Sequence, residues 1–245
     1  MNDTIPATGH LLGAADIRRI AADAGISPTK KFGQNFVIDP GTVRRIVREA
    51  GVTAADHVME VGPGLGSLTL AILETGATMT AVEIDPPLAE RLPGTVAEFM
   101  PEATSRLTVV NRDALTVTPE NVPDFNGDTS FTLVANLPYN VATPILLTLL
   151  ERFDNLGSFL VMVQKEVADR LAAKPGSKIY GTPSVKLAWY GTAERVGTIG
   201  AMCSGRLPMW IPRSSNSPGI RPMTRLPREL RTAQTTAHNG NSYFV

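Results

Sequence analysis

Apolar residues recur along the first 200 residues with two different periods, which together predict alternating helices and strands. Residues 14–24 carry apolar side chains at helical spacing and are expected to form an amphipathic helix. After a loop at residues 27–34, short apolar runs typical of buried strands alternate with helical patterns. The predicted strands are residues 57–61, 78–84, 107–110, 131–135 and 158–163, and the predicted helices are residues 67–75, 88–99, 144–152 and 165–173.

This alternation predicts an α/β fold: a doubly wound, mostly parallel sheet with helices on both faces. In such sheets ligands bind outside the carboxyl ends of the strands. We therefore look for chemistry in the residues that directly follow each predicted strand.

A glycine-rich turn closes the first predicted strand, where residues 60–66 read Glu-Val-Gly-Pro-Gly-Leu-Gly. Glycine at every second position lets the backbone approach a ligand where a side chain would clash. The G-x-G-x-G spacing differs from the G-x-G-x-x-G of dinucleotide binders, whose helix faces a pyrophosphate. The turn therefore favours a nucleotide-type cofactor without a pyrophosphate, close to Gly62 and Gly64. A purely structural turn is the alternative.

Acidic residues stand at the ends of the next two predicted strands. Glu83 lies 21 residues after Gly62, close to the ~20-residue spacing at which an acidic side chain accepts ribose hydroxyls. Asp113 is placed to accept a hydrogen bond from an adenine amino group while the following amide, that of Ala114, donates to the ring. Taken singly, Glu83 fits a solvated strand end and Asp113 fits a helix amino-cap or a turn.

The tetrad Asn136-Leu137-Pro138-Tyr139 follows the fourth predicted strand directly. An adenine amine is a poor nucleophile because its lone pair is delocalised into the ring. The Asn136 side-chain oxygen and the Leu137 carbonyl are two acceptors that can hold the two amine hydrogens and free that lone pair. Pro138 would fix the turn, and Tyr139 would stack on a base swung out of its helix. The alternative is an Asn-x-Pro turn with a core tyrosine.

Composition narrows the class of protein. The chain has 245 residues, of which 43% are hydrophobic, enough to bury a full core. Its apolar runs are shorter than the ~20 residues that span a bilayer, and residues 1–10 lack the pattern of a secretory signal, so we expect a cytoplasmic protein with no membrane partner. The single cysteine, Cys203, allows neither an internal disulfide nor a thiolate metal cluster, and no metal site is expected.

The motifs, in their order along the chain, form a pattern that can be compared with known families. The chain from residue 30 to 200 resembles the dimethyladenosine transferases that modify small-subunit ribosomal RNA, relatives of the erythromycin-resistance methyltransferases. The resemblance rests on KFGQNF at residues 31–36, the glycine turn at 60–66, VEID at 82–85, Asp113-Ala114, NLPYNVATP at 136–144, QKEV at 164–167 and PGSKIYGTPSV at 175–185.

This resemblance implies a Rossmann-like class I methyltransferase that uses S-adenosylmethionine. It also implies the substrate: two adjacent adenosines near the 3′ end of 16S rRNA, each dimethylated at the 6-amino group within the small ribosomal subunit or its precursor. A monomer is expected. The implied catalytic residues are Asn136, Leu137, Pro138 and Tyr139, and the implied cofactor-binding residues are Gln34, Asn35, Phe36, Glu60, Gly62, Gly64, Glu83, Ile84, Asp113, Ala114 and Asn136.

The resemblance ends near Gly200. Residues 201–245 carry six arginines and one acid, and do not match the F-x-P-x-P-x-V-D-S motif and helical domain with which the family continues. Back-translation of residues 201–212 with the triplet boundary moved one base upstream permits a sequence ending in Pro-Asn-Val-Asp-Ser. We therefore interpret residues 201–245 as a frameshifted, disordered tail that has replaced that domain; a natural basic tail is the alternative. The expected domains are an N-terminal helical extension at 1–29, the methyltransferase domain at 30–200 and this tail.

Two rival functions fit the same residues. One is a resistance-type methyltransferase that acts on large-subunit 23S rRNA. The other is a ribosome-assembly factor that binds RNA and cofactor with little turnover. A basic RNA-binding face is indicated by Lys30, Lys31, Arg44, Arg45 and Arg48, although a solvated helix face explains these residues equally well.

Overall fold

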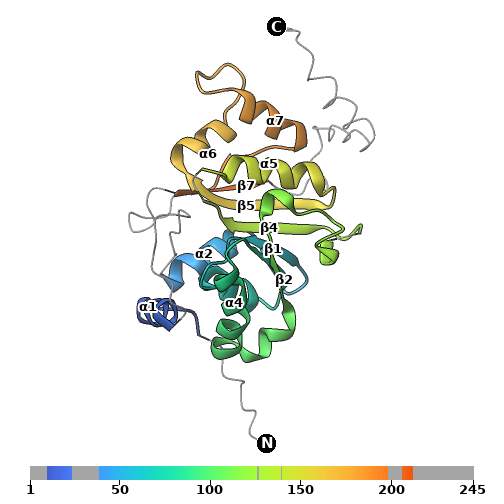
Figure 1. Cartoon of the computed structure of the whole chain (residues 1–245). Helices are drawn as coiled ribbons and strands as arrows, with labels where there is room; N and C mark the ends of the chain where they lie inside the picture. Colours follow the sequence, from blue (N-terminus) through green and yellow to red (C-terminus); the bar gives the residue numbers. More distant parts are fainter. Residues whose placement is uncertain (1–9, 24–38, 126, 139, 198–205, 212–245) are drawn as a thin grey trace, which may run out of the picture.

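A seven-stranded sheet with helices on both faces forms the body of the molecule (Figure 1). The computed structural model describes residues 10–23, 39–125, 127–138, 140–197 and 206–211. The strands are β1 (His57–Val61), β2 (Thr78–Glu83), β3 (Leu107–Asn111), β4 (Phe131–Asn136), β5 (Leu156–Gln164), β6 (Glu194–Arg195) and β7 (Arg206–Ile211). The α-helices are α1 (Ala14–Asp23), α2 (Pro40–Glu49), α3 (Ser67–Glu74), α4 (Pro86–Phe99), α5 (Ala142–Arg152), α6 (Lys165–Leu171) and α7 (Thr182–Tyr190). Short 3-10 turns occur at Pro101–Arg106, Ala114–Thr116 and Pro123–Phe125.

The strand order in the sheet is β3-β2-β1-β4-β5-β7-β6. From β1 to β3 the chain adds strands toward one edge of the sheet, and from β4 onward it adds them on the other side of β1. Strands β1 to β5 are mutually parallel, whereas β7 runs antiparallel to both β5 and β6. The carboxyl ends of β1 and β4 therefore lie side by side at the point where ligands bind in doubly wound sheets. The predicted α/β fold with a mostly parallel sheet is confirmed.

Two hydrophobic clusters cover the two faces of the sheet. One joins α1, α2, α3 and α4 to the sheet and includes Ile20, Val47, Leu70 and Leu92. The other joins α5, α6 and α7 to the opposite face. Helix α1 is held in the first cluster and also by polar contacts with α4, where Arg19 pairs with Glu98. The N-terminal helix thus packs directly on the α/β fold.

Two helices, α2 and α7, are missing from the elements that the sequence analysis names. Helix α2 begins at Pro40 behind an Asp39 cap, whose carboxylate accepts from the Thr42 amide at 2.6 Å, so its start signal was present in the sequence. Helix α7 buries only Ser184 and Leu187, which explains its weak periodicity. Helix α5 starts two residues before Pro144, because proline is tolerated in a first turn, where its missing N–H would have no partner.

Strand β7 corrects one expectation about the end of the chain. The sequence analysis assigns disorder to the whole segment 201–245, yet residues 206–211 pair with β5 from Gln164↔Arg206 to Phe159↔Ile211. An unpaired β5 would present a row of free backbone N–H and C=O groups, and the antiparallel strand β7 supplies backbone partners for them, except where Pro208 has no N–H to donate. Disorder is therefore wrong for these six residues.

Candidate active site

The glycine turn after β1 holds three residues in left-handed backbone conformations. Gly62, Gly64 and Gly66 have φ of 70°, 58° and 97°, values that glycine adopts without the steric cost of a Cβ. The Gly62 amide donates to the Val82 carbonyl at 2.9 Å, which ties the turn to β2. Glycine therefore stands at the three positions of the turn whose backbone angles other residues rarely adopt.

Two of these glycines have different surroundings. A Cβ on Gly66 would lie 2.9 Å from Leu92 Cδ1 of α4, so this glycine permits close packing of the turn against a helix. A Cβ on Gly62 would have no heavy atom of the described residues within 4 Å. The open side of the turn is therefore at Gly62, where a ligand can approach the backbone.

Glu83, the last residue of β2, is a buried carboxylate that braces the turn. Its side chain is only 4% exposed, so the interpretation as a solvated strand end is wrong. Oε2 accepts from the Gly64 amide at 3.2 Å and Oε1 accepts from the Asp85 amide at 3.0 Å. Burial raises the pKa of Glu83, and the two amide bonds oppose that rise. Carboxylate oxygens have further lone pairs, so Glu83 remains able to accept from a ligand hydroxyl.

Glu60 lies beneath the same turn and is held by a side-chain hydroxyl. It is 1% exposed, and Thr69 Oγ1 of α3 donates to Glu60 Oε2 at 2.6 Å. Burial raises the pKa of Glu60 to about 8; the Thr69 hydrogen bond lowers it and the nearby charge of Glu83 raises it. A neutral Glu60 therefore joins β1 to α3 under the glycine turn at neutral pH.

Asp113 stands after β3 and caps a 3-10 turn. Its Oδ1 accepts from the Leu115 amide at 2.9 Å, so the amino-cap alternative describes a real interaction of this side chain. The following residue, Ala114, is buried. Ile84, next to Glu83, leaves 54% of its side chain exposed at the same edge of the sheet, which is an unusual place for a large apolar residue unless a partner covers it.

The tetrad begins on the last residue of β4, the neighbour of β1. Asn136 pairs in register with Met162 of β5, and its side-chain oxygen is shielded from solvent. The Leu137 side chain is fully buried, so only its backbone is available to a ligand. The Pro138 carbonyl accepts from the Val141 amide at 3.4 Å and turns the chain into α5.

The structure thus brings most of the predicted residues to one edge of the sheet and shows some that the sequence analysis missed. Gln34, Asn35, Phe36 and Tyr139 lie outside the described residues. The missed residues are supports: Thr69, the partner of Glu60, and Asn111, whose Nδ2 donates to the Glu83 carbonyl at 2.8 Å. The signal for Thr69 was its position in the first turn of α3, on the side that faces β1.

Other parts of the candidate site and surface can be judged only within the described residues. In that part of the chain no group of three or more His, Cys, Asp or Glu side chains is arranged to hold a metal ion. Nor does any described helix combine the length and hydropathy needed to cross a membrane. Of the basic residues noted on α2, Arg44 makes two hydrogen bonds to Glu74 and Arg45 lies 4.0 Å from Glu49, so much of that positive charge is balanced.

Comparison with known proteins extends over most of the chain. The family model described as "Ribosomal RNA adenine dimethylase" matches residues 27–204. A protein of Bifidobacterium longum subsp. infantis named "Ribosomal RNA small subunit methyltransferase A" is 98% identical over 200 residues, which cover 82% of this chain and 65% of that protein. The protein of the same name from Leifsonia xyli subsp. xyli is 62% identical over 190 residues, covering 78% and 66%. The chain therefore spans about 65% of the length of the first of these relatives.

Solved structures agree on the fold. The 23S rRNA methyltransferase ErmE has a TM-score of 0.59 at 24% identity and covers 74% of this chain and 71% of its own. A dimethyladenosine transferase from Plasmodium falciparum has the same TM-score at 20% identity, covering 71% and 61%. At these identities the likeness supports the methyltransferase fold alone.

Proposed function

Because the chain belongs to the ribosomal RNA adenine dimethylase family, we propose that it transfers methyl groups from S-adenosylmethionine to the 6-amino groups of two adjacent adenosines near the 3′ end of 16S rRNA. The observation that carries this proposal is the convergence of the glycine turn, Glu83 and the Asn136 tetrad at the carboxyl ends of neighbouring strands. In this proposal the substrate is the small ribosomal subunit or its precursor, and the protein acts as a monomer in the cytoplasm.

The residues present fit S-adenosylmethionine. The open side of Gly62 accommodates a ligand against the backbone, and the buried Glu83 carboxylate is an acceptor suited to ribose hydroxyls. Asp113 and Ala114 would face the adenine, with Ile84 against it, and Gln34, Asn35 and Phe36 would hold the methionine end. Once bound, this cofactor supplies a methyl group that is already activated on a sulfonium.

The protein's own contribution to transfer is orientation of the target amine. Asn136 Oδ1 and the Leu137 carbonyl would each accept one amine hydrogen, which holds the nitrogen with its lone pair toward the methyl group. Burial of the Leu137 side chain fixes its carbonyl, because that side chain cannot rotate without disturbing the core. Pro138 sets the turn, and Tyr139 would stack on the base.

The test is transfer of labelled methyl groups to small subunits that lack the modification. We expect incorporation into small but not large subunits; labelling of large subunits alone would point to the resistance-type alternative. Cofactor binding without transfer to either subunit would favour the assembly-factor alternative. Mass spectrometry of the RNA should place two methyl groups on each of two neighbouring adenosines.

The frameshift interpretation of residues 201–245 remains part of this proposal. It predicts that this chain transfers methyl groups more slowly than a version with the frame restored after Gly200, because RNA binding depends on a large positive surface. The nucleotide sequence around codon 200 tests the interpretation directly, and equal rates for the two proteins would contradict the predicted loss.

A further inference from the structure

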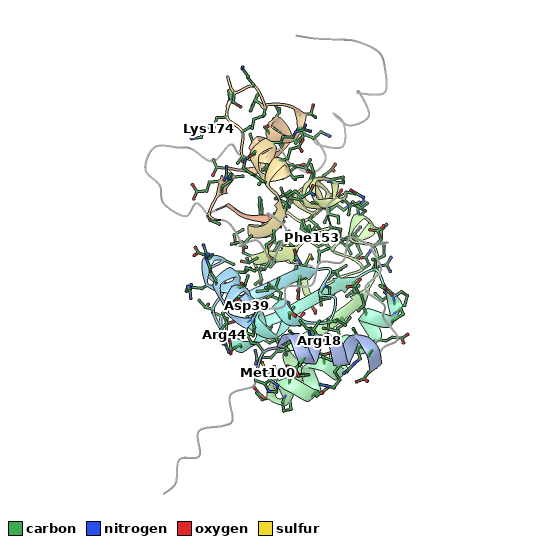
Figure 2. The ribbon with its side chains drawn as sticks, turned by 90° about the vertical axis from the view of Figure 1, so that its left-hand side faces the viewer. Arg18, Asp39, Arg44, Met100, Phe153 and Lys174 are labelled. Carbon is green, nitrogen blue, oxygen red and sulfur yellow. The ribbon has the colours of Figure 1, made fainter. Side chains whose placement is uncertain are left out.

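The hairpin of α6 and α7, residues 165–190, has a charge opposite to that of the chain before it. It contains five basic and two acidic residues, whereas residues 51–164 contain four basic and fourteen acidic residues. Figure 1 shows α6, α7 and their connecting loop at one end of the molecule, and Figure 2 places Lys174 there, far from Arg18 near the other end. Positive charge is thus gathered on one projecting element.

Three lysines of this hairpin have no acidic partner within the described residues. Lys165 pairs with Asp169 and Arg170 pairs with Glu166, so the charges on α6 are balanced locally. Lys174, Lys178 and Lys186 are exposed, and none of them takes part in a described ion pair. Their charges are available to an anionic partner.

Large apolar side chains lie among these lysines. Ile179, Val185 and Trp189 are 50%, 51% and 42% exposed. They account, with Ile84, for all the large apolar residues identified as exposed in the described part of the chain. Exposed apolar groups gathered in one place indicate an interaction surface, and lysines interleaved with an aromatic ring suit a nucleic acid, whose phosphates and bases need both.

The inner side of the hairpin is firmly held, so its outer side is not exposed through poor packing. Ser184 Oγ donates to the Arg170 carbonyl at 2.5 Å and accepts from the Gly181 amide at 3.2 Å. Leu187 is 1% exposed in the same cluster that contains Leu171. Val185, Lys186 and Trp189 therefore project from a fixed helix.

The sheet also places the start of the hairpin one strand away from the tetrad. Helix α6 begins directly after β5, and β5 pairs with β4, which ends at Asn136. The cofactor residues lie on the other side of β4, at β1, β2 and β3. A base delivered to the end of β4 thus lies between the cofactor half on one side and, on the other, the strand from which the hairpin begins.

We propose that the outer face of the α6–α7 hairpin is a docking surface for the RNA substrate, in which Lys174, Lys178 and Lys186 contact phosphates and Trp189 contacts a base. This inference rests on the proposed function for the choice of RNA as partner. Two hairpins packed face to face would bring like charges together, whereas RNA offers phosphates for the lysines and bases for the exposed Trp189, so the surface is committed to RNA.

The experiment uses the full chain and a fluorescein-labelled RNA hairpin carrying the 3′-terminal adenosine pair of 16S rRNA. Fluorescence anisotropy is measured over a series of salt concentrations. The triple variant K174Q/K178Q/K186Q should bind at least about tenfold more weakly, and its slope of log affinity against log salt should fall by about 2 to 3, since each lost phosphate contact removes about one. Trp189→Ala should weaken binding about five- to 100-fold with an unchanged slope, because stacking releases no counterions.

Arg18→Gln is the matched control, since it removes one exposed positive charge at the opposite end of the molecule. Calorimetry with S-adenosylmethionine and thermal melting should be the same for all variants, which separates docking from folding. If the triple variant and Trp189→Ala bind the RNA as tightly as the parent, the docking surface is overturned while the proposed function stands. If the parent binds RNA through the hairpin yet transfers no methyl group, the surface is supported and the proposed function fails.

Light scattering completes the test. A dimer that Trp189→Ala dissociates, together with RNA binding unaffected by the lysine changes, would assign the surface to a second copy of the chain and overturn the proposal.

Discussion

The cofactor half of the sheet, around β1 and β2, and the α6–α7 hairpin differ in the charge and in the burial of their polar side chains. Around β1 and β2 the polar groups are acidic and buried: Glu60 and Glu83 are 1% and 4% exposed and are held by Thr69 and by backbone amides. On the hairpin the polar groups are basic and exposed, and large apolar side chains are left uncovered among them. Buried polar groups suit the binding of a small ligand in a fixed position, whereas exposed basic groups suit the binding of a large polyanion.

The two regions meet at β4, and the largest effect is expected there. Asn136→Ala should lower methyl transfer about 100-fold or more, the range seen when one preorganised polar contact to a reacting centre is removed. Cofactor affinity, measured by calorimetry, should change little, because the side chain acts on the incoming base. Full turnover by this variant on undermethylated small subunits would contradict the amine-binding role.

On the cofactor side, Glu83→Ala should weaken S-adenosylmethionine binding by about 1–3 kcal/mol, the usual effect of losing a charged hydrogen bond. The loss has two sources, since the Gly64 and Asp85 amides would also lose their acceptor. Glu90→Ala, which removes an exposed glutamate from α4, is the control. Equal calorimetric affinity for the two variants would remove Glu83 from the site.

The same substitution, glycine to alanine, can be compared in the two regions, at Gly62 in the glycine turn and at Gly176 in the hairpin. Gly62 and Gly176 have φ of 70° and 89°, and a Cβ on either would meet no atom within 4 Å in the part of the chain that the structure describes. Changing either to alanine should therefore cost a similar ~1–2 kcal/mol of stability in urea unfolding. Only Gly62→Ala should also reduce cofactor affinity, because its Cβ would occupy the ligand's side of the turn. A matching loss of affinity in Gly176→Ala would show that strain alone is responsible.

The prediction with the smallest expected effect on function concerns the pH dependence of folding. The pKa of Glu60 is raised from 4.5 to about 8, so between these values the folded chain keeps a proton that the unfolded chain releases. Stability from this group is therefore fully present below pH 4.5 and falls by roughly 1 kcal/mol per pH unit up to about pH 8. Glu60→Gln should remove that slope, as measured by urea unfolding at several pH values, and parallel curves for parent and variant would contradict a neutral buried Glu60.

Much of this architecture was readable in the sequence because its signals are local. The period of apolar residues depends only on whether a segment is helix or strand, and the G-x-G-x-G turn depends on backbone angles that few residues other than glycine adopt. The positions of the five parallel strands along the chain, the sheet edge that carries the site and the tetrad after the fourth strand could all be predicted in this way. Helix α7 could not, since a helix that leaves Val185 and Trp189 exposed has no clear apolar stripe.

The sequence by itself determined which residues follow each strand and hence which chemistry stands at the carboxyl edge. Only the tertiary structure decided how those residues behave. Glu60 and Glu83 are both glutamates near strand ends, yet one pairs with a hydroxyl nine residues later and the other with the amides of Gly64 and Asp85. The tertiary structure likewise decided that residues 206–211 pair with β5 and join the sheet. Burial, pKa and strand pairing depend on contacts between segments that are distant along the chain, and the spacing of residues in the sequence carries no information about such contacts.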